Sequence, residues 1–169
     1  LSDNGSVEFI GNKASSSSSY AYAYGGAIYG GDYSTITLSG NGSVTFSGNS
    51  AGFGGAIYGR TIELSGNGSG EVSWNTTSSG VVPDESSPYA YGGAIYGDNI
   101  MLSENKEVSF VGNLAHLRLV PSPILLDCLV VGYRGVNRKS CGGAIYGGED
   151  STIELSENGS VTFSGNTAY

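Results

Sequence analysis

The chain has little positive charge, with 7 Lys and Arg residues against 15 Asp and Glu residues and a formal net charge of −8 at pH 7. Nucleic-acid binding requires Lys and Arg to neutralise phosphates, so we expect no nucleic-acid partner. The chain also lacks an apolar run of the ~18 residues that a membrane-spanning helix needs. Its first residues have neither the basic nor the apolar region of a signal peptide. As it stands, the sequence predicts a soluble chain.

Residues suited to catalysis or metal binding are scarce, with one His, two Cys and one Met. No Ser or Cys is positioned by sequence beside His116 as a nucleophile, and no metal-binding spacing is present, so we expect no cofactor and no metal. Glycine, in contrast, is abundant at 29 residues and does not recur at every third position, which excludes collagen. Interior glycine costs a helix about 1 kcal/mol relative to alanine, which makes a helical protein improbable.

Most of these glycines belong to an internal repeat. The hexapeptide Gly-Gly-Ala-Ile-Tyr-Gly recurs at 25–30, 54–59, 92–97 and 142–147. Each copy is followed by an Ile-x-Leu segment, an Asn turn, a Val-x-aromatic segment and, in most units, Gly-Asn. Short segments with period-2 alternation, separated by Gly and Asn turns, are typical of β-strands. Identical units of about 30 residues stack their coils and thereby bury a continuous core.

The sequence therefore predicts an all-β parallel β-helix with about three strands per coil and roughly five coils. A β-sandwich is the alternative, but repeats of this length favour stacking. We treat 1–169 as one β-helix segment. Its expected coils are 1–24 (partial), 25–53, 54–91, 92–141 and 142–169.

Alternation places the Ile and Leu of each Ile-x-Leu strand inward, together with the Val and aromatic residue of the next strand. In the third unit we align Val72-Ser73-Trp74 with Val44-Thr45-Phe46, which makes Trp74 inward-facing, leaves two extra residues before Val72 and puts Thr77 where Asn is expected. We expect one corner to hold structural asparagines whose amides bond to the next coil. These are Asn12, Asn49, Asn113 and Asn166. The Asn-Gly-Ser sequences at 4, 41, 67 and 158 have the form of glycosylation sequons, and we interpret them as turns.

Gly-Gly-Ala-Ile together with Phe-x-x-Asn, as in Phe46-Ser47-Gly48-Asn49, resembles the repeat of the chlamydial polymorphic membrane proteins, which are autotransporter passengers. The resemblance covers almost the whole chain outside the insertions. It implies a right-handed, single-stranded β-helix that is secreted through a C-terminal barrel and displayed at the bacterial surface for adhesion to host cells. Neither an export signal nor a barrel is visible in the sequence, so we expect a piece of a passenger with open coil ends that are able to stack on other copies.

The number of residues between the aromatic residue and the next Gly-Gly differs from unit to unit. We expect all variation in repeat length to arise at the corner between these two motifs. Insertions 13–24, 76–91 and 114–141 should then project on one side as an interaction face. Insertion 114–141 carries an apolar run and a net charge of +3, from four basic residues against Asp127. The residues predicted to bind a partner are Tyr20, Tyr22, Tyr24, Tyr89, Tyr91, Arg118, Leu125, Leu126, Arg134, Arg138 and Lys139.

Each of these features also has a purely structural interpretation. The Tyr-x-Tyr segments would extend a strand and pack on neighbouring coils, and the apolar run of 114–141 would cover the flank of the helix. Cys128 and Cys141 are able to form a disulfide in an oxidising compartment if their geometry fits. A further ladder on the body of the helix is expected from the outward tyrosines of the hexapeptide. These are Tyr29, Tyr58, Tyr96 and Tyr146.

The leading hypothesis is a non-enzymatic adhesin segment at the bacterial cell surface or outer membrane, or secreted, that binds a host or neighbouring-cell protein or glycan. The first alternative is a carbohydrate-active enzyme that uses Glu63 and Glu154, which alternation places in one outward row about 9.6 Å apart. The second is a structural protein that stacks end to end. A regular Thr array for ice binding is absent from these rows.

Overall fold

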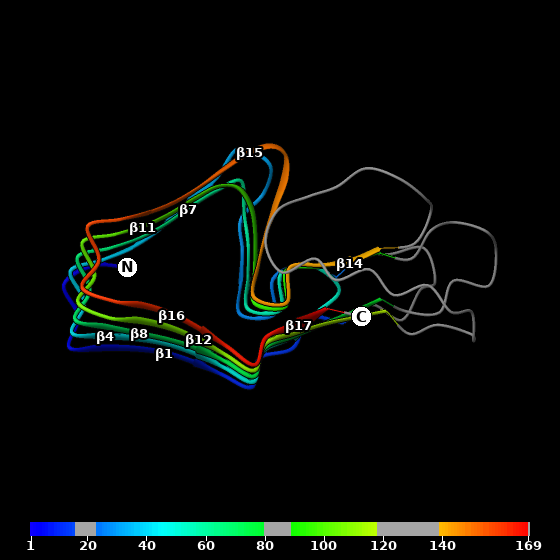
Figure 1. The fold of residues 1–169 in the computed structure, drawn as a ribbon, viewed down its shortest axis with the longest axis horizontal. Coiled ribbons are helices and arrows are strands. Elements are labelled where there is room, and N and C mark those ends of the chain that lie inside the picture. The colour runs from blue at the N-terminus through cyan, green and yellow to red at the C-terminus, as the bar shows by residue number, and fades with distance from the viewer. Residues whose placement is uncertain (16–22, 80–88, 118–138, 169) are drawn as a thin grey trace.

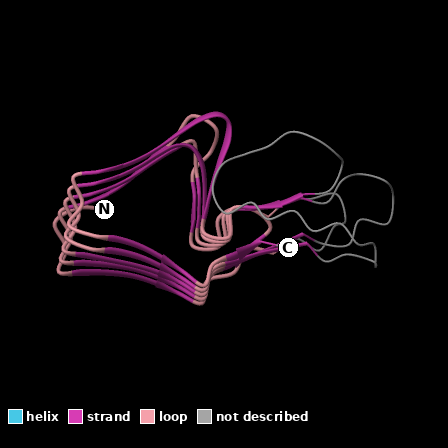
Figure 2. Ribbon diagram, in the orientation of Figure 1, coloured by secondary structure: helices cyan, strands magenta, loops and turns pink. Residues whose placement is uncertain are grey.

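The computed structural model describes residues 1–15, 23–79, 89–117 and 139–168. Over these residues the chain forms strands joined by turns, as Figure 2 shows, and contains no helix. Accordingly, no helix in the described part of the chain is long and apolar enough to cross a membrane.

The strands stack in register from coil to coil, and every pairing between them is parallel. One side of the coil is a five-stranded sheet in the order β1-β4-β8-β12-β16. Its strands are β1 (Ser6–Ile10), β4 (Ser43–Ser47), β8 (Ser69–Ser73), β12 (Val108–Val111) and β16 (Val161–Ser164). The other two sides share a sheet, which turns a corner within its two longest strands. Its strands are β2 (Ile28–Tyr29), β3 (Thr35–Ser39), β6 (Ile57–Tyr58), β7 (Thr61–Ser65), β11 (Ile95–Ser103) and β15 (Ile145–Ser156).

These three sides enclose a triangle in cross-section, and an arm extends from one of its corners (Figure 1). The arm has two sheets. One has the order β17-β13-β9-β5, and the other pairs β10 with β14. Its strands are β5 (Ser50–Ala51), β9 (Thr76–Ser79), β10 (Tyr89–Tyr91), β13 (Leu114–Leu117), β14 (Lys139–Cys141) and β17 (Thr167–Ala168). The structure is thus a parallel β-helix, as the repeat predicts.

The core consists of ladders of like side chains, because parallel in-register pairing sets each residue beside its equivalent in the next coil. Ile62 pairs with Ile36 and Ile100, and Leu64 pairs with Leu38 and Leu102. Rings stack in the same way, with centroids 4.9 Å apart between Phe9 and Phe46 and also between Phe110 and Phe163. Leu155 and Phe163 continue these ladders in the last described coil and are 45% and 41% exposed, because no further described coil covers them.

The predicted alignment of the third unit is wrong. Strand β8 pairs Gly70 with Val44 and Val72 with Phe46, so the inward residues are Gly70 and Val72, and no residues are inserted before them. Trp74 lies beyond the end of the strand and is 66% exposed instead of inward-facing. The aromatic side chain of Trp74 suggests alignment with Phe46, but the positions of the flanking turns set the register.

Two asparagine ladders hold two corners of the triangle. At one of them, each amide nitrogen donates to the Oδ1 of the asparagine in the next coil, over 2.9–3.0 Å. This ladder contains the four asparagines predicted to share a corner and a fifth, Asn75, which takes the place assigned to Thr77. Its members are Asn12, Asn49, Asn75, Asn113 and Asn166.

A second ladder, which the sequence analysis did not foresee, uses the asparagines of the Asn-Gly-Ser turns together with Asn105. Its members are Asn4, Asn41, Asn67, Asn105 and Asn158, linked by amide bonds of 2.9–3.0 Å. Asn41, Asn67 and Asn105 are at most 2% exposed. In the inner coils the asparagine of this turn is therefore a buried structural residue.

Repeat spacing also varies at a second corner, which contradicts the expectation of a single variable corner. A single residue, Arg60 or Asp98, links the hexapeptide to the Ile-x-Leu strand in two coils. In the other two coils the link is longer and spans 31–34 and 148–151, and the pairing of β11 with β15 shifts register at this point. This corner carries short insertions, whereas the long ones leave from the arm.

Candidate functional site

The three long insertions begin and end on the same arm. The strands that lead into them belong to one sheet, and the segments that return from them are paired with one another. Insertion 76–91 begins on β9 and ends on β10, and insertion 114–141 begins on β13 and ends on β14. For insertion 13–24, Lys13 pairs with Ser50 and Tyr24 pairs with Phe53. The outgoing and returning strands are in contact, so the arm is a two-layer support for all three insertions.

Many of the residues predicted to bind a partner lie outside the described part of the chain. These are Tyr20, Tyr22, Arg118, Leu125, Leu126, Arg134 and Arg138, and Cys128 lies outside as well. The backbones of Tyr89 and Lys139 pair directly between β10 and β14. Cys141 is buried, 4% exposed, at the end of β14. Its disulfide with Cys128 stays a prediction.

Two of the predicted binding residues, Tyr24 and Tyr91, belong to a cluster of rings that we call the aromatic corner. It joins the outward tyrosines of the hexapeptide to the aromatic residues that immediately precede Gly-Gly. Its members are Tyr24, Tyr29, Phe53, Tyr58, Tyr91, Tyr96 and Tyr146. Parallel register produces the cluster, because the two rows of residues come from adjoining segments of each coil.

The rings of the aromatic corner stack closely across coils. Tyr58 and Tyr96 lie with centroids 4.8 Å apart and planes 5° apart, and Tyr91 and Tyr146 with centroids 4.4 Å apart and planes 8° apart. Tyr29 is 57% exposed at the first of these coils. The predicted tyrosine ladder is therefore present, and it forms a continuous aromatic surface with the residues at the base of the insertions.

Two carboxylates, Asp32 and Asp98, lie near this surface. Burial raises the pKa of the Tyr58 hydroxyl well above its ordinary value, and the neighbouring Tyr96, Tyr24 and Asp32 add to the shift. Burial also raises the pKa of Tyr96, with Asp98 as the next largest cause. Asp98 lies 3.9 Å from the Arg60 guanidinium, at a pair that is about half exposed on both sides. The corner thus combines neutral phenols with a mostly acidic rim.

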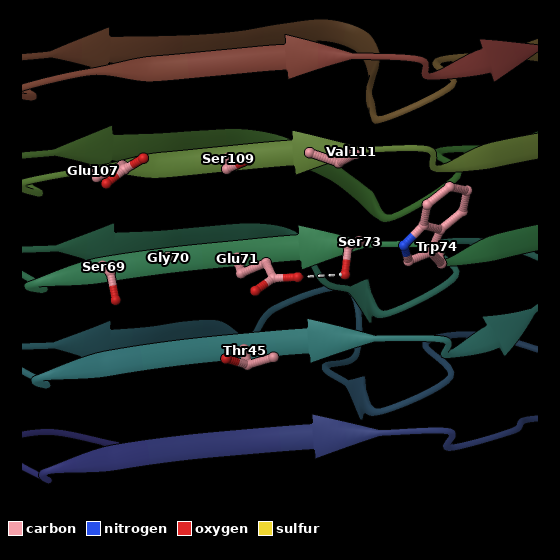
Figure 3. A pocket seen from close by; sticks show the side chains of 9 residues that line it. All are labelled: Thr45, Ser69, Gly70, Glu71, Ser73, Trp74, Glu107, Ser109 and Val111. Atoms are coloured by element: carbon pink, nitrogen blue, oxygen red, sulfur yellow. Dashed lines mark hydrogen bonds between the residues drawn. The ribbon is translucent and has the colours of Figure 1, made fainter.

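A second surface feature lies on the outer face of the five-stranded sheet, beside Trp74, which the repeat pattern predicts to face inward and which is 66% exposed. Figure 3 shows a hollow beside Trp74, with Glu71, Ser73 and Ser109 among the side chains around it. The Ser73 hydroxyl donates a hydrogen bond of 2.9 Å to the Glu71 carboxylate. Glu71 lies in one outward row with Thr45 and Ser109, because it pairs with both, and Ser73 belongs to the neighbouring row of Ser47 and Val111.

The glutamates considered for catalysis occupy the row predicted for them. Glu63 and Glu154 both pair with Met101, which lies between them, on β7, β15 and β11 respectively. Met101 is 40% exposed, so an apolar side chain separates the two carboxylates. Within the described residues, no group of three or more His, Cys, Asp or Glu side chains is arranged to hold a metal ion.

Comparison with protein families finds a match in the first coils of the β-helix. The model of the Chlamydia polymorphic membrane protein repeat matches residues 6–31 and 43–60. The matched segments include β1, β2, β4 and β6, together with the first two Gly-Gly-Ala-Ile-Tyr-Gly copies. Searches of curated proteins and of solved structures found no match to this chain. Residues 6–31 and 43–60 of the stacked coils are thus similar to the Chlamydia polymorphic membrane protein repeat.

Proposed function

We propose that this chain is a non-enzymatic passenger segment that acts as an adhesin. The repeat family implies an outer-membrane or surface location. In this proposal the stacked coils are a rigid spacer, and insertions 13–24, 76–91 and 114–141 bind a host or neighbouring-cell protein or glycan. The observation that carries it is the shared arm, which supports the entry and exit of all three insertions in two contacting sheets.

Rigid support matters because a binding loop loses less conformational entropy when its ends are already held in place. Recognition residues are commonly found on loops that a rigid scaffold positions. Here the ends of insertion 114–141 are held by the pairing of β13 with β9 and of β14 with β10. The aromatic corner at the base of the arm adds tyrosines, which offer a large contact area at a low entropic cost.

Adhesion is tested by removing each insertion without removing its supporting strands. Residues 118–138 would be replaced by a short Gly-Ser linker that leaves β13 and β14 intact, and 16–22 and 80–88 would be shortened in the same way. Binding of the purified chain to cultured host cells should fall in at least one variant and be lost when all three insertions are shortened. Unchanged binding of the triple variant would overturn the proposal.

A matched control shortens a different insertion. The link 148–151 would be reduced to a single residue, as at Asp98, which changes a corner away from the arm. This variant should bind cells as the unmodified chain does. Far-UV circular dichroism of every variant would verify that the β-helix is retained.

End-to-end self-association is a second proposed interaction. The hydrogen bonds between asparagine side chains have a direction, because each amide nitrogen donates to the Oδ1 of the asparagine in the coil nearer the C-terminus. The first coil therefore offers acceptors where the last coil offers donors, which supports head-to-tail stacking of two copies. Sedimentation velocity over a range of concentrations would detect such assemblies, and a monomer at all concentrations would contradict them.

A further inference from the structure

Trp74 occupies a position that glycine holds in the other coils. It precedes Asn75 of the first asparagine ladder, and the residues that precede the other members are Gly11, Gly48, Gly112 and Gly165. All four glycines have φ between 61° and 66°, and Trp74 has φ 55°. A side chain other than glycine in this left-handed region costs of order 1 kcal/mol. Asp3, Glu104 and Glu157 also adopt it, before asparagines of the second ladder, so the unusual feature at Trp74 is the large aromatic side chain and not the backbone.

The indole of Trp74 lies against the backbone of the next coil. A Cβ placed on Gly112 would come within 2.6 Å of a ring carbon of Trp74, so in this position the ring lies directly against the glycine backbone. The residue nevertheless stays 66% exposed. One part of the ring thus rests on a fixed support while the rest meets solvent, and burial alone does not explain a large aromatic residue at a strained position.

The hollow beside this ring is lined mainly by polar groups. Its volume is about 360 Å³, within the usual range of ligand sites. Two carboxylates, Glu71 and Glu107, and the hydroxyls of Ser69 and Ser109 line it (Figure 3). None of the described residues around it is Lys or Arg, and Trp74 is its only ring.

We propose that this hollow is a binding site for a neutral pyranose sugar, with Trp74 as the stacking platform and Glu71 as a hydrogen-bond acceptor. A pyranose has an apolar C–H face that packs on an aromatic ring and a rim of hydroxyls that donate to carboxylates. A cationic ligand is the less fitting occupant, because recognition of ammonium groups uses a cage of several rings, whereas one ring lines this hollow.

The charge of the hollow selects against acidic sugars. Glu71 and Glu107 would repel a sialic acid or a sulfate group, and no lining cation among the described residues compensates. The site lies on the five-stranded sheet and not on the insertions, so it goes beyond the adhesin proposal. Sugar binding and cell binding are measured in separate experiments. A negative result in one therefore leaves the other proposal standing.

The intrinsic fluorescence of the chain tests the site directly, because Trp74 is the only tryptophan in the sequence. Lactose, maltose and N,N′-diacetylchitobiose would be titrated into the intact chain at millimolar concentrations. At least one should give a saturable blue shift of the Trp74 emission. If lactose is the ligand, 3′-sialyllactose should bind about tenfold more weakly, which corresponds to ~1.4 kcal/mol. If another disaccharide binds, its uronic-acid counterpart serves as the acidic comparator.

Variants distinguish stacking from a general effect on the fold. Trp74→Gly restores the residue that the other coils use, so the chain should fold, and its affinity by isothermal titration calorimetry should fall at least about tenfold. Trp74→Tyr keeps a ring and should retain part of the affinity, whereas Glu71→Gln weakens the acceptor and should lower it about fivefold. Glu63→Gln, on another side of the coil, should leave it unchanged.

Three outcomes would overturn the inference. The first is no saturable emission change with any of the three disaccharides. The second is unchanged sugar affinity in Trp74→Gly. The third is an emission change with a trimethyl-lysine peptide and none with the sugars, which would assign the hollow to a cation.

Discussion

The first asparagine ladder and the aromatic corner are both stacks of like side chains contributed by successive coils, but different forces hold them. In the ladder, Asn49 and Asn113 are fully buried, and each amide both donates and accepts hydrogen bonds. In the aromatic corner the rings are partly exposed and pack by contact, with interplanar angles from 5° to 82°. The ladder requires one residue type, because only asparagine provides this donor and acceptor geometry. The corner tolerates variation, since Phe53 takes a place that tyrosines hold in other coils.

The largest expected effect comes from breaking the ladder with Asn75→Ala. The change removes the acceptor for both the backbone N–H and the amide of Asn49, and it removes the donor to the Phe46 carbonyl. Each buried group left without a partner costs about 1–3 kcal/mol, so we expect a loss of roughly 3–5 kcal/mol in the free energy of unfolding. Urea denaturation followed by circular dichroism measures it. The control, Ser78→Ala on the exposed face of β9, should change stability by less than about 0.5 kcal/mol.

A smaller loss is expected from Tyr96→Ala in the aromatic corner. Tyr96 contacts the rings of Tyr58, Tyr91 and Tyr146 but is only partly buried. Half-buried packing and ring stacking together should contribute about 2–3 kcal/mol. The same urea denaturation applies. Tyr96→Phe keeps the ring and should stay near the unmodified chain; a larger loss for Tyr96→Ala than for Asn75→Ala would reverse the comparison.

Alkaline pH should affect the aromatic corner and leave the ladders unaffected, because asparagine does not titrate. The pKa of Tyr58 and of Tyr96 is raised in the folded chain, chiefly by burial, above the unfolded value of about 10. Below that value both states keep the protons and stability is unaffected. As pH rises above it, the unfolded chain loses protons first, so the folded state becomes less stable.

The thermal unfolding midpoint, measured between about pH 8 and pH 11.5, should therefore fall at the alkaline end. Replacing Tyr58 and Tyr96 by Phe should flatten this fall. The control is Tyr33→Phe, since the Tyr33 side chain is 94% exposed. An equally steep fall in the Tyr58 and Tyr96 double variant would refute the assignment.

The smallest effect is expected at the rim of the aromatic corner. Arg60 lies 3.9 Å from Asp98 and 5.7 Å from the centre of the Tyr33 ring, but the ion pair is about half exposed. Exposed pairs contribute little, so Arg60→Ala should change the free energy of unfolding by less than about 1 kcal/mol. Raising the salt concentration should reduce the difference further. A loss comparable to that of Tyr96→Ala would mean that the rim is an integral part of the stack.

Local pattern was sufficient to predict the regular parts of the molecule. Ile62 and Leu64 are buried as period-2 alternation requires, and Asn12, Asn49, Asn113 and Asn166 form hydrogen bonds along one corner. The pattern failed at Trp74, where residue identity and register conflict. The second asparagine ladder was missed for a related reason: Asn-Gly-Ser has the local signature of an exposed turn, and only stacking buries its asparagine.

The sequence by itself therefore determined the repeat, its strands and the ladders in its core, because parallel in-register stacking copies each local pattern from coil to coil. Tertiary structure decided what depends on the exact pairing of neighbouring coils. It brought the two rows of the aromatic corner together, put Asn75 into the ladder and turned Trp74 and Glu71 outward on the sheet. The physical reason is that alternation fixes which residues share a face, whereas a shift of one or two residues in register decides which residues meet across coils.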